Sequence, residues 1–465
     1  PVIDEAKLPQ HMYAMLAATA GVTSVSVAGD TVDALPVMIP STKSVFGEAH
    51  YSFTLAPTLG FDHAEATGAA LPANYELAAW APDALLGPAW PAIYAALGSA
   101  IHNDYPVIEG LLNAVHLDHS ITLEYTPEQM LERGITTIDV TSHVAAVDES
   151  SSGRIVTVAL ELKANGEHVG STQERFAIRG RATGNRAPSE AAPFGGAKVE
   201  VVDTPRSVLR RVSVKAPDDM TPFAIVSGDY NPIHTSYAAA KVAGMDAPLV
   251  HGMWLSATAQ HAAEAVVASQ GGAQIAGWTY YMYGTVDLND EVEITVERVG
   301  RVVGGGLSLE VTCRINKQVV SRASAYTFAP KVAYVYPGQG IQSAGMGLDE
   351  RTKSKAVDEV WRRADAHTRS AMGFSILAIV RDNPTEIVAR GVTYRHPEGV
   401  LNLTQFTQVA LATLAIGQTA RMREEGVLVP GAAFAGHSLG EYDALAAYAE
   451  VFPLETVLDL VFQRG

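Results

Sequence analysis

The seven residues 228–234, "GDYNPIH", place a carboxylate and an imidazole on either side of a proline. Pro232 blocks the continuation of a regular helix, so Asp229 and His234 are expected to meet across a bent loop. Asn231 can hydrogen-bond within its own loop and Pro232 fixes the next backbone angle, so the loop would hold both groups rigidly. Such a pair suits the addition or removal of water beside a carbonyl, because one group exchanges the proton on carbon and the other serves the oxygen.

The stretch "APLVHGM" at 247–253 follows the heptad and predicts the start of a helix over 252–269. Charge that develops on a thioester carbonyl needs a donor, and the first turn of a helix offers free N–H groups and a favourable dipole. Gly252 at this position would let the carbonyl approach closely. His251 is interpreted as a histidine that packs the loop, not as a catalyst.

Other interpretations of the heptad are weaker. Asp-x-Asn-Pro alone is a common turn. A calcium loop that began at Asp229 would need Gly at its sixth position and Glu at its twelfth, and the sequence has His234 and Ala240 there. A zinc site could draw on His234, His251 and His261, but their spacing fits no closed ligand set. No metal is therefore expected.

A second motif, "GHSLG" at 436–440, has the G-x-S-x-G pattern of a strand-to-helix turn that exposes a serine hydroxyl. Ser438 would be the nucleophile, and the backbone N–H of Leu439 would be an oxyanion donor. The pattern alone does not separate a hydrolase from a transferase. Its companions are "PGQG" at 337–340 and "QRG" at 463–465.

The elements that must position the heptad occur twice. Apolar spacing predicts a helix in each copy, and alternation predicts four strands after it. A further strand is expected at 45–55. The two copies are joined by a linker near 183–198 that is rich in Gly, Pro and Ala, and only the second copy contains the heptad. The predicted elements are a helix at 88–102 with strands at 120–126, 134–147, 153–166 and 167–180, then a helix at 252–269 with strands at 277–286, 290–302, 305–317 and 318–330.

After residue 330 the pattern changes to alternating strand and helix: a strand at 331–340, a helix at 400–426, and a strand, sharp turn and helix over 429–451. The fold class is therefore α+β with a separate α/β part at the end. The expected division is a lead-in at 1–32, a first unit at 33–188, a second unit at 189–330 and the α/β part at 331–465.

Composition excludes several classes of protein. Hydrophobic residues make up 48% of the 465-residue chain, the net charge is −17, and no apolar run approaches the roughly 18 residues of a membrane span. Neither nucleic acid nor membrane is therefore an expected partner. The basic cluster at 206–215 (Arg206, Arg210, Arg211 and Lys215) is interpreted as a solvated strand face. A single cysteine, Cys313, favours a reducing, cytoplasmic location.

The stretch "SGDYNPIHTSYAAAKVAGMDAPLVHGM" resembles the signature of MaoC-like hydratases and R-specific enoyl-CoA hydratase 2, which have the hot-dog fold, a long helix wrapped by an antiparallel sheet. The resemblance implies that Asp229 and His234 are the catalytic pair and that Gly252 binds the thioester carbonyl. The first copy resembles the non-catalytic hot-dog portion of the dehydratase region in fungal-type and actinobacterial type I fatty acid synthases. This resemblance covers nearly all of residues 40–330, and it implies tandem hot-dog domains.

The serine motif and its companions resemble the malonyl/palmitoyl transferase domain of the same synthases. The resemblance implies Ser438 as nucleophile, Gln339 as oxyanion-hole residue and Arg464 as partner of a malonyl carboxylate, which a planar guanidinium can bind through both oxygens. The catalytic histidine of that family lies well beyond the serine, and no residue of this sequence matches it. The transferase part, which is incomplete, is therefore expected to be inactive and not fully ordered.

These resemblances imply a fragment of a bacterial, actinobacterial-type fatty acid synthase. Its opening at Pro1 and its end at Gly465 also suggest a piece of a longer chain. Its reaction would convert (3R)-3-hydroxyacyl thioesters to trans-2-enoyl thioesters and water. His234 would be the base at the α-carbon, Asp229 the acid to the hydroxyl, and Asn231 a substrate-binding residue.

No cofactor is expected in the fragment. The substrate would arrive on the phosphopantetheine arm of an acyl carrier domain, with CoA esters as surrogates. Other synthase domains would be partners, and the full-length protein is expected to be a homo-oligomer. Two alternatives stay open: a free-standing hydratase that acts on CoA esters, and a non-catalytic assembly module.

Overall fold

The computed structural model describes residues 25–27, 30–32, 48–72, 80–102, 105–107, 114–150, 153–179, 199–269 and 274–465. The chain forms two compact units: the residues up to Gly300 with Leu307–Phe328, and Arg301–Gly306 with Ala329–Gly465. Most of the predicted lead-in at 1–32 lies outside the described residues, which include only the paired strands β1 (Val25–Val27) and β2 (Asp30–Val32) there. The predicted linker at 183–198 lies outside them entirely.

The first unit is built on one sheet of ten strands, in the order β10-β12-β13-β14-β11-β6-β9-β8-β7-β3. The strands of the first half are β3 (Glu48–Thr54), β6 (Ala114–Leu123), β7 (Thr137–Ser150), β8 (Gly153–Ala164) and β9 (Glu167–Arg179). Those of the second half are β10 (Val201–Lys215), β11 (Ile275–Met282), β12 (Glu291–Val302), β13 (Leu307–Ile315) and β14 (Gln318–Thr327).

The two halves mirror each other about the pair β6 and β11, which run antiparallel with Ile121 opposite Trp278. Moving outward, β9, β8, β7 and β3 follow on one side, and β14, β13, β12 and β10 follow on the other. Each half therefore has the same strand order: its first strand lies at an edge of the sheet, and its second strand lies at the centre beside its last strand. The predicted duplication is confirmed, and the two copies share a single sheet.

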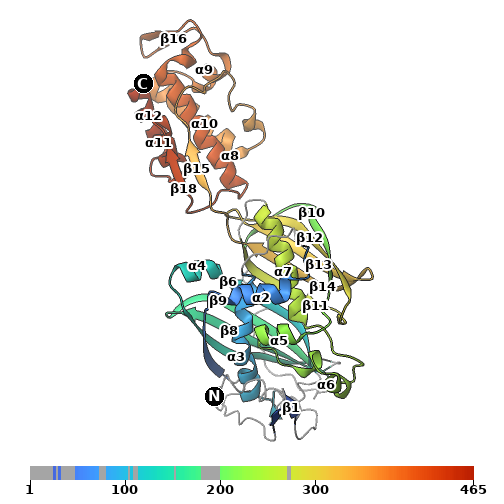
Figure 1. Ribbon diagram of the computed structural model, residues 1–465. Helices are drawn as coiled ribbons and strands as arrows, with labels where there is room; N and C mark the ends of the chain where they lie inside the picture. Colours follow the sequence, from blue (N-terminus) through green and yellow to red (C-terminus); the bar gives the residue numbers. More distant parts are fainter. Residues whose placement is uncertain are drawn as a thin grey trace. The chain divides into compact units, whose positions relative to one another are not determined.

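Each half contributes one long helix that packs against this sheet (Figure 1). Helix α3 (Leu86–Ser99) contacts β3, β7 and β8, and α7 (Gly252–Ser269) contacts β10, β11 and β13. Both helices are largely apolar around their circumference, as expected for helices enclosed on all sides. One hydrophobic core runs through both halves. This arrangement is a tandem hot-dog fold.

Helix α7 has the predicted bounds, whereas α3 ends at Ser99 and not at 102. Beyond α3 the chain is extended, because β4 (Ile101–His102) pairs with β5 (Tyr105–Pro106). The shorter helices of this unit are α2 (Leu59–Gly68), α4 (Pro127–Glu132), α5 (Thr221–Ser227) and α6 (Tyr237–Val242). No helix in the described part of the chain is long and apolar enough to cross a membrane.

The second unit pairs two parallel strands, β15 (Ala333–Tyr336) and β18 (Ala433–Gly436), in agreement with the α/β pattern predicted there. Its core lies among the helices α8, α10 and α12. Every residue of 331–465 is described, contrary to the expectation that this part is not fully ordered. The other elements are α8 (Lys355–His367), α9 (Ile376–Asp382), β16 (Glu386–Ala389), β17 (Val392–Arg395), α10 (Thr404–Glu424), α11 (Leu439–Asp443) and α12 (Leu454–Arg464).

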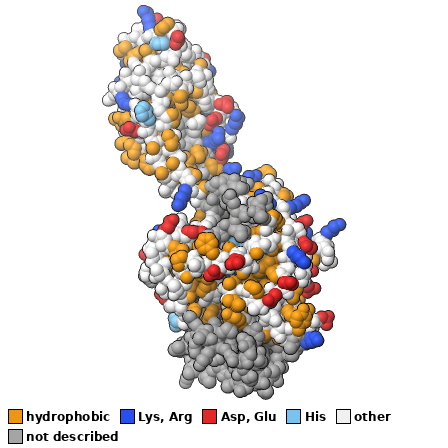
Figure 2. Space-filling view, viewed as in Figure 1, with side chains coloured by type: hydrophobic (Ala, Val, Ile, Leu, Met, Phe, Trp, Pro, Cys, Tyr) orange, Lys and Arg blue, Asp and Glu red, His pale blue; other side chains and the backbone are white. Residues whose placement is uncertain are grey.

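The charged surface agrees with the interpretation of the basic cluster at 206–215 as a solvated strand face. Arg206 of β10 forms ion pairs with Glu297 of β12 at 3.0 Å and with Glu310 of β13 at 2.8 Å. Its positive charge is therefore paired with carboxylates on two other strands of the same sheet. On the face drawn in Figure 2, Lys and Arg side chains are scattered among acidic and hydrophobic ones. Cys313 is buried.

Candidate active site

The heptad forms the bent loop that its composition predicts. Helix α5 ends at Gly228, whose φ of 67° is the left-handed conformation that glycine adopts at helix ends. The side-chain oxygen of Asn231 accepts a hydrogen bond from Ile233 N at 3.3 Å, and Pro232 opens a short 3-10 turn, Pro232–His234. The loop thus turns back on itself between the carboxylate and the imidazole.

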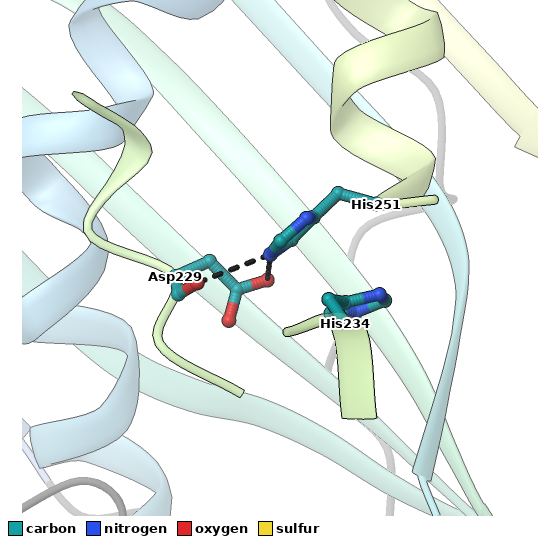
Figure 3. Close-up of side chains that lie close together, drawn as sticks. All are labelled: Asp229, His234 and His251. Atoms are coloured by element: carbon teal, nitrogen blue, oxygen red, sulfur yellow. Dashed lines mark hydrogen bonds and ion pairs between the residues drawn. The ribbon is translucent and has the colours of Figure 1, made fainter. Parts of the chain in front are cut away.

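This loop brings Asp229 and His234 together with a third residue, His251. One nitrogen or oxygen atom from each of the three side chains lies within 4.8 Å of the chosen atoms of the other two. In Figure 3 the ring of His251, at the start of α7, lies over that of His234 and points toward Asp229. Asp229 and His251 are buried, and His234 is partly buried.

Hydrogen bonds within the protein occupy one of the two carboxylate oxygens of Asp229. Oδ1 accepts hydrogen bonds from the Tyr94 hydroxyl at 3.0 Å and from Asn231 N at 3.1 Å. Oδ2 lies 3.9 Å from His251 Nε2. Oδ2 is therefore the oxygen better placed to exchange a proton with a substrate.

His234 is arranged as a base. Its Nδ1 lies 2.9 Å from the carbonyl oxygen of Leu249, so Nδ1 carries the proton and Nε2 keeps a free electron pair. Burial lowers the pKa of His234 below 6.5, although the charge of Asp229 and the bond to Leu249 oppose that change. The imidazole is consequently neutral, and able to accept a proton, at neutral pH.

His251 holds this arrangement together. Its ring stacks on that of His234, with centroids 3.8 Å apart and 26° between the ring planes. Its Nε2 donates to the backbone oxygen of Asp229 at 3.1 Å. Burial, and then the repulsion that two protonated rings at His234 and His251 would have, keep the pKa of His251 well below 6.5. His251 therefore packs the loop, as its sequence position suggested, but it also ties the loop to α7, which the sequence did not indicate.

Gly252 lies at the first position of α7, as predicted. A Cβ atom added there would lie 2.4 Å from Sδ of Met282, so only glycine leaves this space open. The backbone N–H groups of a first helical turn have no acceptor within the helix and are available to a ligand. The predicted oxyanion donor is thus placed on the same cavity as the acid–base pair.

That cavity has a volume of about 130 Å³ and is lined by both halves of the first unit. Its polar lining includes Asp229, Asn231 and His234, and Gly252 also lines it; the other polar lining residues are Tyr94, His116, Tyr280, Thr285 and Ser321. Most of the remaining wall is apolar, as a fatty acyl chain requires. The apolar lining includes Trp90, Ile93 and Leu97 of α3, Phe176 of β9, and Met253, Leu255 and Met282 of the second half.

The three clustered side chains are also close enough to reach one metal ion. His234 Nδ1 and His251 Nε2 are both engaged with backbone carbonyl oxygens, an arrangement that favours proton transfer. His261, the third histidine considered for zinc, lies elsewhere: its Nε2 is 2.9 Å from the hydroxyl of Thr67. The cluster that the structure forms therefore differs from the set of histidines considered from the sequence.

Ser438 occupies the sharp turn between β18 and α11, with a φ of 58° and a ψ of −104°. The two glycines of the motif are required by close backbone contacts. A Cβ atom on Gly436 would lie 2.0 Å from the carbonyl carbon of Gly440, and one on Gly440 would lie 2.1 Å from the oxygen of Tyr336. The motif therefore has the tight strand-to-helix turn that the pattern predicts.

The predicted companions of Ser438 lie near it. Nη2 of Arg464 donates to Ser438 Oγ at 2.7 Å, and Nη1 of Arg464 contacts Gln408 Oε1 at 3.2 Å. Gly338, next to the exposed Gln339, packs against His437: an added Cβ would lie 3.1 Å from the oxygen of His437. Leu439 begins α11, so its N–H belongs to a first turn.

Comparison with known proteins identifies two domains. The family described as "MaoC like domain" matches residues 197–318, and the family described as "Acyl transferase domain" matches residues 333–465. The chain is 33% identical over 290 residues to the fatty acid synthase beta subunit stcK of Emericella nidulans, a match that covers 55% of this chain and 15% of that protein. It is 32% identical over 289 residues to the fatty acid synthase subunit beta of Saccharomyces cerevisiae, covering 54% of this chain and 14% of that one.

Among solved structures, HtdX of Mycobacterium tuberculosis aligns with 60% of this chain and 98% of its own, at 16% identity and a TM-score of 0.42.

The chain spans about one seventh of the length of the two synthase subunits. The two family matches fall on the heptad and on the serine motif, respectively. Residues 197–318 therefore form a MaoC like domain, and residues 333–465 form an acyl transferase domain.

Proposed function

We propose that the first unit dehydrates (3R)-3-hydroxyacyl thioesters to trans-2-enoyl thioesters in fatty acid synthesis. The observation that carries this proposal is the placement of Asp229, His234 and the start of α7 at Gly252 on one largely apolar cavity. The names of the two synthase subunits support fatty acid synthesis as the setting. The actinobacterial type remains a prediction from sequence.

In this reaction Nε2 of His234 takes the proton from the α-carbon, and negative charge grows on the thioester oxygen. The N–H groups at the start of α7 stabilise that charge. The C–O bond at the β-carbon breaks, and the hydroxyl leaves as water with a proton from the carboxyl of Asp229. The proton on His234 must then return to Asp229. In hydration the two residues exchange roles.

The substrate would be delivered by an acyl carrier domain on a phosphopantetheine arm, with CoA esters as surrogates, and the other domains of a synthase would be partners. The free-standing hydratase remains the competing proposal, and it predicts CoA esters as the preferred substrates. Comparison of kcat/KM for one acyl chain on CoA and on an acyl carrier protein separates the two proposals.

The pair is tested by hydration of crotonyl-CoA and of a long-chain enoyl-CoA by the parent chain, Asp229→Asn and His234→Ala. Because general acid–base catalysis typically contributes about 10²- to 10⁴-fold, each variant should lose activity of that order at unchanged thermal stability. An inert parent chain would instead support the assembly module. Variants as active as the parent would remove Asp229 and His234 from the chemistry.

For the acyl transferase domain, we propose that Ser438 does not take up an acyl group rapidly in this chain. Its hydroxyl accepts a hydrogen bond from the Arg464 guanidinium, which cannot act as a base. Within the described residues 329–465, no imidazole or carboxylate forms a hydrogen bond with Ser438 Oγ. The hydroxyl therefore stays weakly nucleophilic.

The assignments of Gln339 and the Leu439 N–H to an oxyanion hole, and of Arg464 to a malonyl carboxylate, remain proposals that their positions near Ser438 support. Rapid mixing with malonyl-CoA, followed by mass spectrometry, should detect no stoichiometric acylation burst on Ser438. A burst that disappears in Ser438→Ala would contradict the proposed inactivity.

A further inference from the structure

The half that lacks the heptad places a tyrosine hydroxyl on the catalytic carboxylate. Tyr94 lies in α3, and its side chain is buried in the cavity wall together with Asp229 and His234. Its hydroxyl donates to Asp229 Oδ1 at 3.0 Å, although the two residues are 135 positions apart in the sequence. The contact therefore exists only because the two halves pack together.

The distance between α3 and the catalytic loop is set by backbone contact. A Cβ atom added to Gly87, in the first turn of α3, would lie 2.7 Å from the carbonyl oxygen of Val226. A Cβ atom added to Gly228 would lie 3.0 Å from the carbonyl oxygen of Gly87. No side chain can be inserted between these segments. Since Gly228 immediately precedes Asp229, the same contact fixes α3 beside the carboxylate.

The tyrosine ring is also held in place. The ring of Trp90, one helical turn earlier in α3, meets that of Tyr94 edge to face, with centroids 6.0 Å apart and planes at 75°. Packed aromatic rings of this geometry restrict each other's rotation. The hydroxyl therefore meets Asp229 in a fixed orientation, as a positioning group requires.

The hydrogen bond has a directional effect on Asp229. Together with Asn231 N, the Tyr94 hydroxyl occupies Oδ1. Two donors on one oxygen fix the plane of the carboxyl group. Oδ2, on the side of His251, is left to exchange the proton with the substrate oxygen.

We infer that Tyr94 is a positioning residue for Asp229, so that the half without the heptad completes the active site. This inference rests on the dehydratase function proposed above. It departs from the expectation that the first copy is non-catalytic, because a side chain of that copy would control the geometry of the acid.

The test is Tyr94→Phe in the whole chain, assayed by hydration of crotonyl-CoA. Tyr125→Phe is the matched control, because Tyr125 also belongs to the first half, but its ring packs under the Arg133 guanidinium at 3.8 Å and is not part of the cavity lining. Loss of a hydrogen bond to a charged group should lower kcat about 10- to 100-fold in Tyr94→Phe, with little change in KM. Tyr125→Phe should match the parent.

The split between kcat and KM separates positioning from general loss of structure, because a misplaced carboxylate slows the chemical step without weakening substrate binding. Both variants should unfold thermally at the same temperatures as the parent.

The outcomes are distinguishable. An active parent chain with an equally active Tyr94→Phe variant would overturn the role of Tyr94 and leave the proposed function intact. An equal loss in both variants would also overturn it. A parent chain without hydratase activity would overturn the proposed function and, with it, the role of Tyr94.

Discussion

At the scale of single residues, Gly252 shows how a side chain from a strand can dictate the identity of a residue at the start of a helix. Met282 ends β11, and its sulfur occupies the place where a Cβ atom on residue 252 would be. A methyl group there has to displace the methionine, which is flexible and can yield at small cost to folding. The same methyl group would narrow the space beside the first N–H groups of α7, which are the proposed donors to a thioester carbonyl.

Gly252→Ala should therefore lower kcat/KM far more than stability. The loss of one oxyanion donor typically costs about 10²- to 10³-fold in kcat, and partial obstruction should approach the lower value. Crotonyl-CoA hydration and thermal unfolding of Gly252→Ala measure the two effects. The double variant Gly252→Ala with Met282→Ala, in which the contact is absent, should recover part of the activity. Unchanged activity in Gly252→Ala would show that this space is not used by the substrate.

Two contacts of Asp229, with Tyr94 and with His251, could not be predicted from the sequence. Asp229, His234 and Gly252 lie within one short segment, so loop composition and a helix start were enough to predict that they meet. Tyr94 reaches Asp229 only through tertiary packing, and in the apolar pattern of α3 it looks like any other core residue. His251 stood next to the predicted helix, but its bond to Asp229 depends on how the loop folds back.

At the scale of elements, periodicity predicted α7 and the strands β7, β8, β9, β12, β13 and β14 well, because each is a regular segment with one consistent pattern. The strand expected at 120–126 begins earlier, as β6 at Ala114, and β10, the longest strand, was indicated only by the interpretation of residues 206–215 as a strand face. The end of α3 was predicted less accurately, since Ile101 and His102 continue the apolar spacing but pair as a strand. Helix α8 was not predicted, although its buried residues Val357, Val360, Trp361 and Ala364 recur at the spacings of three and four that are typical of a helix. The mirror order of the strands follows from the duplication, although the shared sheet could not be inferred from two repeats alone.

At the scale of the first unit, a buried network of charged and polar side chains links its two halves. His119 of β6 lies 2.8 Å from Asp83 and 2.7 Å from Glu174, and all three are buried. Asp83 also accepts hydrogen bonds from Ser256 and Gln260 of α7. Burial alone would lower the pKa of His119, but the carboxylates of Glu174 and Asp83 raise it to about 10. The imidazole is therefore a cation in the folded protein at neutral pH.

His119→Gln should destabilise the chain by about 3–5 kcal/mol, because it leaves two buried carboxylates without their cation. The pKa of His119 is raised on folding, so its contribution is fully present below about pH 6.5 and is lost as pH rises through about 10. Urea unfolding at pH 6.5 and pH 10 should show a large difference between variant and parent that shrinks at the higher pH. His168→Gln, at an exposed ion pair with Glu161, is the control and should cost little. A penalty that does not change with pH would show that His119 is not held as a cation.

The pairing of β6 with β11 also limits how a substrate can arrive. To move the two halves of the first unit apart, the protein would have to break the backbone hydrogen bonds between β6 and β11, at the centre of the ten-stranded sheet. Substrate entry by such an opening would therefore cost too much free energy. If the proposed function holds, an acyl chain must instead enter the cavity lined by His234 and Gly252 without parting β6 from β11. The depth of that cavity would then limit the length of the acyl chain.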